Sequence, residues 1–437
     1  MQMSMKQTSS RDRLEQALAR ISDPKGEGAR TCLTVYQEAA RAAADAADAR
    51  SRTGVSLDPL DGVIVSIKDL FDVAGEPTRA GSKILAEEAK PAAADAAIVR
   101  RLRAAGAVIV AKTNMTEFAF SGIGANPHFG TPGNPWDRTR VPGGSSAGAP
   151  VAVADGMCEI SVGTDTGGSV RIPASLCGLV GFKPSRQRVP TDGAFPLSYS
   201  LDSIGPIARS VADCIKADAV MAGEQFSPLE PVTLAGLRFG IAEGLPLDRL
   251  DEAVAAAFNA AIKRLDNAGV RISREFLSLF DGMSEVNAKG GISPPEACAI
   301  HRERLSRRAK DIDPNVLVRI ERGGAVSATD YDDMVRERTR LVRAMDERLT
   351  GLDVLLMPTT SIVAPTIAEV ADPKVFAARN AALLRNTAII NFFDLCAVTL
   401  PISAAPSLPV GLMLIARNSH DHRLLRIAAA VEKFFAN

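Results

Sequence analysis

The chain has 437 residues, 46% of them hydrophobic, and its 51 basic residues balance its 51 acidic ones. This length exceeds the size at which a single hydrophobic core usually keeps growing, so we expect two domains or one large sheet-based domain. The balanced charge disfavours nucleic acid and anionic membranes as partners, because both attract strongly basic surfaces.

Residues that bind metals or form disulfides are sparse. The six cysteines are scattered without a C-x-x-C pair, and of the four histidines only His420 and His422 are neighbours. This pattern predicts no metal site, and it is typical of buried cysteines in a reducing compartment. The N-terminal sequence MQMSMKQTSSRDRLEQ has no apolar run of signal-peptide length, and no segment reaches the roughly 18 apolar residues that span a bilayer. We expect a cytoplasmic protein.

Helix and strand patterns alternate through the first half of the chain. The alanine-rich residues 36–51 predict a helix, and the Gly and Pro that follow end it. Residues 62–69, GVIVSIKD, form an apolar run that ends at Lys68. Residues 95–106 then predict a helix that leads into a strand over 108–111. A second helix from Gly148 leads in the same way into a strand over 159–164.

The second half continues this alternation and then changes character. Residues 285–350 are highly charged with helical periodicity, which predicts solvated helices that cover a site. The last ninety residues return to short apolar runs. We find no linker of disordered composition and therefore expect one domain over 1–437, with a catalytic core at about 60–215. Strands alternating with helices predict an α/β fold, in three α/β/α layers with a large mixed, mainly parallel central sheet covered by helices.

Polar residues follow three of the predicted strands: Lys68-Asp69, Lys112-Thr113-Asn114, and Thr164 to Ser169. Ligands of parallel sheets bind outside the carboxyl ends of the strands. We therefore expect these three segments to share one site.

Two clusters of glycine and hydroxyl residues, 140–150 and 163–169, stand out. A single cluster of this kind is more often a flexible loop. Two such loops, each before a helix, can instead form a binding site for a negatively charged group. Neither matches a phosphate-binding or dinucleotide-binding motif, so no cofactor is expected. Residues 144–148 match the G-x-S-x-G elbow, but the prolines and arginines before them replace the apolar strand that an elbow requires.

A serine can also be activated by a neutral lysine. The pKa of an exposed lysine is about 10.4, and burial lowers it by several units. Lys68 follows the apolar residues VIVSI and is placed for such burial, although a lysine at a strand end more often reaches solvent. Lys112 is the weaker candidate for this role.

The sequence resembles the amidase signature family in these segments. GVIVSIKD at 62–69, GGSSAG at 143–148 and GTDTGGSVRIP at 163–173 match the family's motifs, and the resemblance extends over nearly the whole chain. It implies an amidohydrolase that cleaves the C–N bond of a small carboxamide through a serine acyl-enzyme. The carboxylate and ammonia or an amine would be released. The resemblance also makes a homodimer plausible.

The resemblance assigns roles to individual residues. Ser169 would be the nucleophile, Ser145 the proton relay, and Lys68 the base, with a cis peptide bond between Gly144 and Ser145. An oxyanion hole would use the backbone N–H groups of Thr166, Gly167, Gly168 and Ser169.

Further residues would support these. Asp165 and Arg171 would pair to hold the loop, and Ser146 would supply a hydroxyl behind the catalytic groups. Ile172 stands where a malonamidase-like subgroup carries an arginine, so a malonate half-amide is not expected.

Two alternatives stay open at this point. One is the A subunit of a glutamine-dependent tRNA amidotransferase, which uses the same triad. The other is a non-catalytic anion or nucleotide binder that uses the Gly-rich loops. For the substrate pocket, we expect contributions from Met115, Phe118 and Phe120, and at its mouth from Glu296 or His301.

Overall fold

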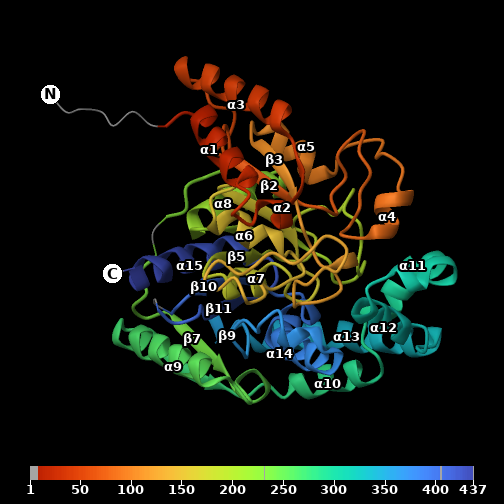
Figure 1. The fold of residues 1–437 in the computed structure, drawn as a ribbon. Helices are drawn as coiled ribbons and strands as arrows, with labels where there is room; N and C mark the ends of the chain where they lie inside the picture. Colours follow the sequence, from red (N-terminus) through yellow and green to blue (C-terminus); the bar gives the residue numbers. More distant parts are fainter. Residues whose placement is uncertain (1–7, 231, 404–405, 437) are drawn as a thin grey trace.

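The computed structural model describes residues 8–230, 232–403 and 406–436. Its strands form one 11-stranded sheet in the order β1-β3-β2-β4-β6-β5-β10-β11-β9-β7-β8 (Figure 1). The strands are β1 (Cys32–Val35), β2 (Ile64–Lys68), β3 (Val108–Thr113), β4 (Ile160–Thr164), β5 (Val180–Lys183), β6 (Ile204–Ala208), β7 (Arg238–Ala242), β8 (Arg271–Glu275), β9 (Val354–Pro358), β10 (Cys396–Pro401) and β11 (Gly411–Ala416).

Helices surround this sheet. The α-helices are α1 (Ser10–Ser22), α2 (Gly28–Thr31), α3 (Gln37–Arg52), α4 (Lys83–Glu88), α5 (Ala97–Ala104), α6 (Gly148–Ala154), α7 (Arg171–Leu176), α8 (Val211–Ala222), α9 (Glu252–Asn267), α10 (Leu279–Ala288), α11 (Ser293–Arg308), α12 (Pro314–Gly323), α13 (Ala328–Arg348), α14 (Pro373–Phe392) and α15 (Asp421–Ala436). Short 3-10 turns are η1 (Glu117–Ala119), η2 (Leu245–Leu247), η3 (Ala309–Asp311) and η4 (Glu369–Ala371).

Several helices begin at a residue whose side chain accepts a hydrogen bond from the first turn. Ser9 caps α1, Ser210 caps α8 and Ser327 caps α13 in this way. Asp313 and Asp372 do the same for α12 and α14, each just before a proline. Such caps satisfy backbone N–H groups that have no partner within the helix.

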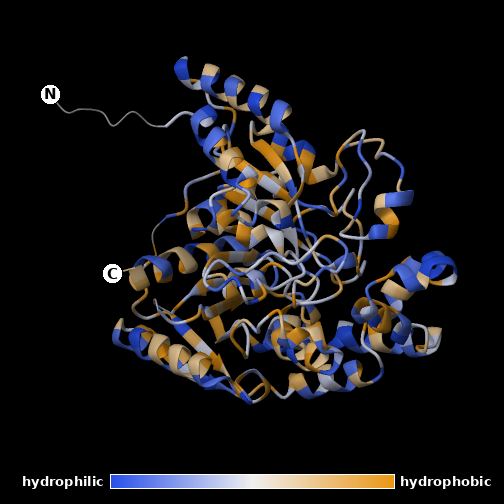
Figure 2. Ribbon diagram, viewed as in Figure 1, coloured by the Kyte–Doolittle hydropathy of each residue, from blue (hydrophilic) through white to orange (hydrophobic). Residues whose placement is uncertain are grey.

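Strand side chains alternate between the two faces of the sheet, so a core forms on each face. In β11, Leu412 and Leu414 belong to one core, while Met413 and Ile415 belong to the other. Helices α5, α8, α9 and α15 cover the first face, and α1, α3, α6, α7, α13 and α14 cover the second. Figure 2 shows the apolar strands at the centre between helices that carry hydrophilic residues on their outer surfaces. The predicted three α/β/α layers are confirmed.

The sheet is mixed, as expected, but the expectation that it is mainly parallel is wrong. β2 pairs in parallel with β3 and β4, and β7 with β8 and β9. The other six pairings are antiparallel. For one of these pairings the length of the connection supplies a physical reason. The 402–410 connection between β10 and β11, for example, is shorter than the roughly dozen residues that a parallel crossover needs.

The elements predicted from local patterns agree with the structure within a few residues. The predicted helix over 36–51 is α3, and the strands predicted at 108–111 and 159–164 are β3 and β4. The charged stretch 285–350 contains α11, α12 and α13. α11 packs against α12, and α12 contacts α14. The N-terminal sequence examined for a signal peptide begins with residues 1–7, which lie outside the described residues.

Among the helices that the structure describes, none is long and apolar enough to cross a membrane.

Replacing Leu414 with alanine should destabilise the sheet. Leu414 is fully buried in β11, and removing its side chain leaves a cavity worth about 2–5 kcal/mol of unfolding free energy. Leu57→Ala is the matched control, because Leu57 is 52% exposed. Guanidinium denaturation of both variants measures the effect, and equal midpoints would contradict the assignment of Leu414 to the core.

Candidate active site

The parallel strands β2 and β4 are neighbours, so their carboxyl ends meet. Lys68 ends β2 and Thr164 ends β4. Lys68 Nζ donates hydrogen bonds to Ser145 Oγ and to Thr164 Oγ1, both at 2.8 Å. All three side chains are buried. The structure thus brings Lys68 and Ser145 together, and it adds Thr164, whose only signal in the sequence is its place at the end of the adjacent strand.

The charge state of Lys68 follows from its surroundings. Burial lowers the pKa of Lys68 to about 7, although the carboxylates of Asp202 and Asp165 oppose the fall. A lysine with this pKa is partly neutral at neutral pH, so its nitrogen has a lone pair that can accept a proton. The geometry therefore supplies a base without a histidine.

Asp202 is a residue that sequence analysis missed. It accepts a hydrogen bond from Thr166 Oγ1 at 2.6 Å and others from the backbone N–H groups of Leu197 and Ser198. Burial of the carboxyl group raises the pKa of Asp202 to about 6. Asp202 thus joins the 197–203 loop to the catalytic loop and sets part of the potential at Lys68.

The segment that carries Ser145 is held by its backbone. The Gly144–Ser145 peptide bond is cis, and the Gly144 N–H donates to Gly122 O at 2.9 Å. A Cβ at position 144 would lie 2.6 Å from the backbone nitrogen of Gly124, so only glycine fits there. The Thr116 N–H donates to Ser145 O at 2.9 Å. These contacts leave the Ser145 side chain free to bond Lys68.

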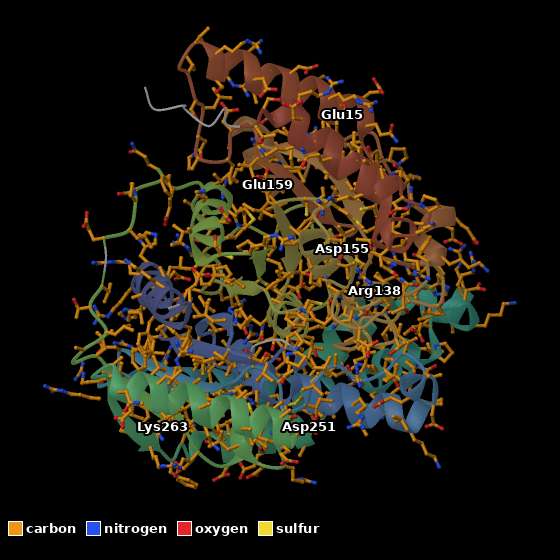
Figure 3. The ribbon with its side chains drawn as sticks, turned by 60° about the vertical axis from the view of Figure 1, so that its left-hand side comes forward. Glu15, Arg138, Asp155, Glu159, Asp251 and Lys263 are labelled. Carbon is orange, nitrogen blue, oxygen red and sulfur yellow. The ribbon has the colours of Figure 1, made fainter. Side chains whose placement is uncertain are left out.

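An ion pair fixes the helix that follows. Arg138 donates to both carboxylate oxygens of Asp155, at 2.8 and 2.9 Å, and Figure 3 shows the two labelled side chains next to one another. Asp155 caps the end of α6, and Arg138 lies in the segment before the serines. Both ends of the serine-rich segment are therefore anchored.

The position of Ser146 differs from the expectation of a supporting hydroxyl. Its backbone N–H donates to Ser169 O at 3.4 Å, but its buried Oγ has no hydrogen-bond partner among the described residues. The hydroxyl instead packs against β4, where a Cβ at Gly163 would lie only 2.5 Å from it. Ser146 contributes through its backbone and its small size.

The loop from Thr164 to Ser169 is built around the Asp165 carboxylate. Asp165 accepts from the backbone N–H of Gly168 at 2.9 Å and of Val170 at 3.2 Å. It also accepts from Arg171 Nε at 3.0 Å and Nη2 at 2.8 Å. Burial alone would raise the pKa of Asp165, but the Arg171 charge outweighs it and lowers the value to about 2. Asp165 is thus ionised and holds the turn.

The oxyanion donors expected from the sequence need one correction. The Gly168 N–H already donates to Asp165, so it is not available to a substrate. The N–H groups of Thr166, Gly167 and Ser169 have no acceptor within the part of the chain that the structure describes. Gly168 is required for another reason: its φ is +132°, and a Cβ there would lie 2.1 Å from Thr387 Oγ1.

Ser169 opens into a cavity of about 270 Å³. Thr166 and Gly167 line it together with Ser169, and other walls come from the second half of the chain. These walls include Arg319 of α12 and Asn391 of α14, together with residues between α10 and α11. The free N–H groups and the Ser169 hydroxyl therefore face a space in which a small molecule fits.

Most of the expected pocket residues do not line this cavity. Phe120 does, but Met115 and Phe118 are buried in the core. Glu296 is turned away to accept hydrogen bonds from Ser198, Ser200 and Tyr331. His301 packs on the Phe118 ring at 4.1 Å. Apolar contacts hold Met115, Phe118 and His301, and hydroxyl donors hold Glu296, away from the cavity. The sequence pattern does not reveal these contacts.

Lys112 does not join the site either. In the sheet register Lys112 pairs with Ile67, whereas Lys68 pairs with Thr113. Paired residues point to the same face, so the Lys112 side chain lies on the face opposite to that of Lys68. Burial lowers the pKa of Lys112, and its nearest carboxylate is Glu76 at 3.9 Å.

Known proteins resemble this chain in sequence and fold. The model of the family described as Amidase matches residues 13–425. The chain belongs to the Amidase family. It is 40% identical to 2-amino-5-chloromuconic acid deaminase of Comamonas testosteroni over 90% of this chain and 86% of that protein. It is 36% identical to the A subunit of the glutamyl-tRNA(Gln) amidotransferase of Anaeromyxobacter dehalogenans (strain 2CP-C), over 98% and 93%. A crystal structure of an amidase matches with a TM-score of 0.87 and 35% identity, covering 98% and 96% of the two chains.

Membership of the Amidase family confirms that the protein is a hydrolase of carboxamide C–N bonds. In the described ranges, no group of three or more His, Cys, Asp and Glu residues is placed to hold a metal ion.

Asp165→Asn should destabilise the protein, because it leaves the buried Arg171 charge without its partner. The expected loss is about 3–5 kcal/mol. Asp332→Asn is the control, since it removes an exposed pair with Arg336 and should change stability by less than about 1 kcal/mol. Because the pKa of Asp165 is lower in the folded protein than in the unfolded chain, the Asp165 carboxylate stabilises the folded protein fully above about pH 4. This stabilisation declines toward pH 2. Denaturant titrations of the variants at pH 7 and pH 3 measure both effects. If Asp165→Asn lost more unfolding free energy at pH 3 than at pH 7, the expected direction of the pH dependence would be contradicted.

Proposed function

We propose that the protein hydrolyses a small carboxamide through an acyl-enzyme on Ser169. The observation that carries this proposal is the 2.8 Å hydrogen bond from the buried Lys68 Nζ to Ser145 Oγ, beside the cavity that Ser169 lines. A base, a hydroxyl that can relay protons and a serine facing a small cavity form the set that acyl transfer needs.

Acylation begins when Ser169 Oγ attacks the amide carbonyl carbon. Its proton passes to Ser145 Oγ as the Ser145 proton passes to neutral Lys68 Nζ. The N–H groups of Thr166, Gly167 and Ser169 hold the negative carbonyl oxygen. The C–N bond then breaks, and the leaving nitrogen takes the proton back through Ser145.

Deacylation repeats these steps with water. Lys68 accepts a proton from water through Ser145, and the resulting hydroxide attacks the ester carbonyl. The ester C–O bond breaks and Ser169 Oγ regains its proton. The products are a carboxylate and ammonia or an amine, and no cofactor takes part in the proposed steps.

The size of the cavity, about 270 Å³, supports a small substrate. One relative is named for a small molecule, 2-amino-5-chloromuconic acid, and is a deaminase. We infer that this protein also acts on a small free molecule.

A second candidate function is the A subunit of a tRNA amidotransferase, favoured by the 36% identity to such a protein over nearly the whole chain. In that case glutamine would be the amide, and its ammonia would pass to a partner protein. Glutaminase activity that appears only when such a partner is added would support this function.

We also infer that residues 1–437 act as one domain. Strands from both ends of the chain share one sheet, and both halves line the cavity, which supports this inference. A cytoplasmic location and a homodimer stay predictions from the sequence.

Ser169→Ala should abolish hydrolysis and covalent labelling. Without the nucleophile, kcat is expected to fall by about 10⁴-fold or more. Ser175→Ala is the matched control, because Ser175 is equally buried in α7 and its hydroxyl has no partner among the described residues. Mass spectrometry after treatment with a fluorophosphonate locates the labelled residue. Labelling of Ser169→Ala to the wild-type extent would overturn the assignment.

The pH dependence should report Lys68. Its pKa of about 7 predicts that kcat/KM falls about tenfold per pH unit below pH 7, because the protonated amine accepts no proton. The Asp202 carboxylate favours protonated Lys68. Asp202→Asn should therefore shift the acidic limb of the kcat/KM profile to lower pH. Asp45→Asn, on the exposed side of α3, should leave the limb in place. A shift to higher pH in Asp202→Asn would contradict the role of Lys68.

A further inference from the structure

Arg319 of α12 is a cation without a partner in the cavity that Ser169 lines. Among the described residues that line this cavity, it is the one that carries a charge. Its Nε is buried without a hydrogen-bond partner, and no carboxylate of the described residues forms an ion pair with it. Other buried arginines near the site are paired, Arg171 with Asp165 and Arg338 with Asp394. The Arg319 side chain as a whole is half-buried, so its charge is only partly hydrated and no carboxylate compensates for the lost hydration. This leaves the guanidinium available to an anionic ligand.

The guanidinium of Arg319 is held ready for a ligand. Its central carbon lies 4.5 Å from the centroid of the Phe120 ring, which also lines the cavity. This stacking fixes the plane of the guanidinium and leaves its N–H edge free. Burial and Arg322 lower the pKa of Arg319 to about 10, so the group still carries its charge at neutral pH. A planar, charged N–H fork is suited to a carboxylate.

The cavity has no complementary site for a cation. In the described part of the chain, no aspartate or glutamate lines it, and its polar side chains apart from Arg319 are hydroxyls and amides. A substrate ammonium group would therefore lose its hydration without gaining an ion pair. This distinguishes an acid with one amide from an amino acid such as glutamine, which carries both charges.

We propose that Arg319 binds a carboxylate of the substrate, and that the substrate is the monoamide of a short dicarboxylic acid without an amino group. This inference rests on the proposed hydrolysis at Ser169. The amide would lie at Ser169 and the carboxylate at Arg319, which lines the same cavity. Hydrolysis converts the monoamide and one water into the dicarboxylate and ammonium. The arginine that would bind the carboxylate belongs to α12. At position 172 of α7, where the malonamidase-like subgroup carries its arginine, this chain has an isoleucine.

Three substrates with the same five-carbon chain test the proposal: pentanamide, the monoamide glutaramate, and glutamine. Wild-type kcat/KM should be highest for glutaramate, and at least about tenfold lower for each of the other two. Arg319→Met should lower kcat/KM for glutaramate by about 10- to 100-fold, mainly through KM, and leave pentanamide within about twofold. Arg319→Lys should recover part of the loss. Equal losses for glutaramate and pentanamide would overturn the role of Arg319, and glutamine turnover equal to that of glutaramate would overturn the absence of an ammonium group.

Arg322→Met is the matched control, because Arg322 lies one turn further along α12 and is exposed outside the cavity.

A binding measurement separates this proposal from the catalytic one. Calorimetry with the Ser169→Ala variant should detect glutarate, and adding Arg319→Met should weaken this binding by about 10- to 100-fold. Fluorophosphonate labelling of Ser169 in the Arg319→Met variant should equal that of the wild type. If the Ser169→Ala variant fails to bind glutarate while Ser169 of the wild type is labelled, the carboxylate proposal is wrong and the proposed hydrolase stands. If Ser169 is not labelled in the wild type, the proposed function itself is wrong.

Discussion

The carboxylate of Asp165 connects parts of the chain that are far apart in sequence. It accepts from the N–H groups of Gly168 and Val170 in its own loop, and from the guanidinium of Arg171 at the start of α7. The side-chain amide of Asn391, near the end of α14, donates to it at 3.0 Å. Because these donors come from three elements, the conformation of the catalytic loop depends on the packing of α14 against α7.

This arrangement explains why the loop contains two glycines with different tasks. The Gly168 N–H is used by Asp165, while Thr387 of α14 occupies the space that a side chain at 168 would need. Gly167 lines the cavity and its N–H has no acceptor among the described residues. One glycine lets the loop close on α14, and the other leaves a backbone donor exposed to the cavity.

Two charged groups matter most, the Lys68 amine that bonds Ser145 and the Arg319 guanidinium that lines the cavity, and burial affects the pKa of both. Burial lowers the pKa of Lys68 to about 7, because its hydrogen-bond partners are hydroxyls and carboxylates lie only further away. Burial lowers the pKa of Arg319 only to about 10, because a guanidinium starts from a much higher value. One group can therefore exchange a proton at neutral pH, while the other keeps a fixed positive charge.

Local sequence patterns were enough to locate the helices and strands with a clear period, and the residues that meet at the ends of β2 and β4. Local pattern and the rule that parallel strands end together marked Lys68 and the Gly/Ser segments as candidates, while the roles expected of them came from the resemblance to the amidase signature family. Three-dimensional packing was needed to establish which N–H groups stay free, which lysine faces Ser145, and which side chains line the cavity. Those outcomes depend on sheet register, on connection lengths and on contacts between residues hundreds of positions apart, such as Asn391 with Asp165. The alternation of β2 and β3 puts Lys68 and Lys112 on opposite faces, and no property of either residue alone could reveal that.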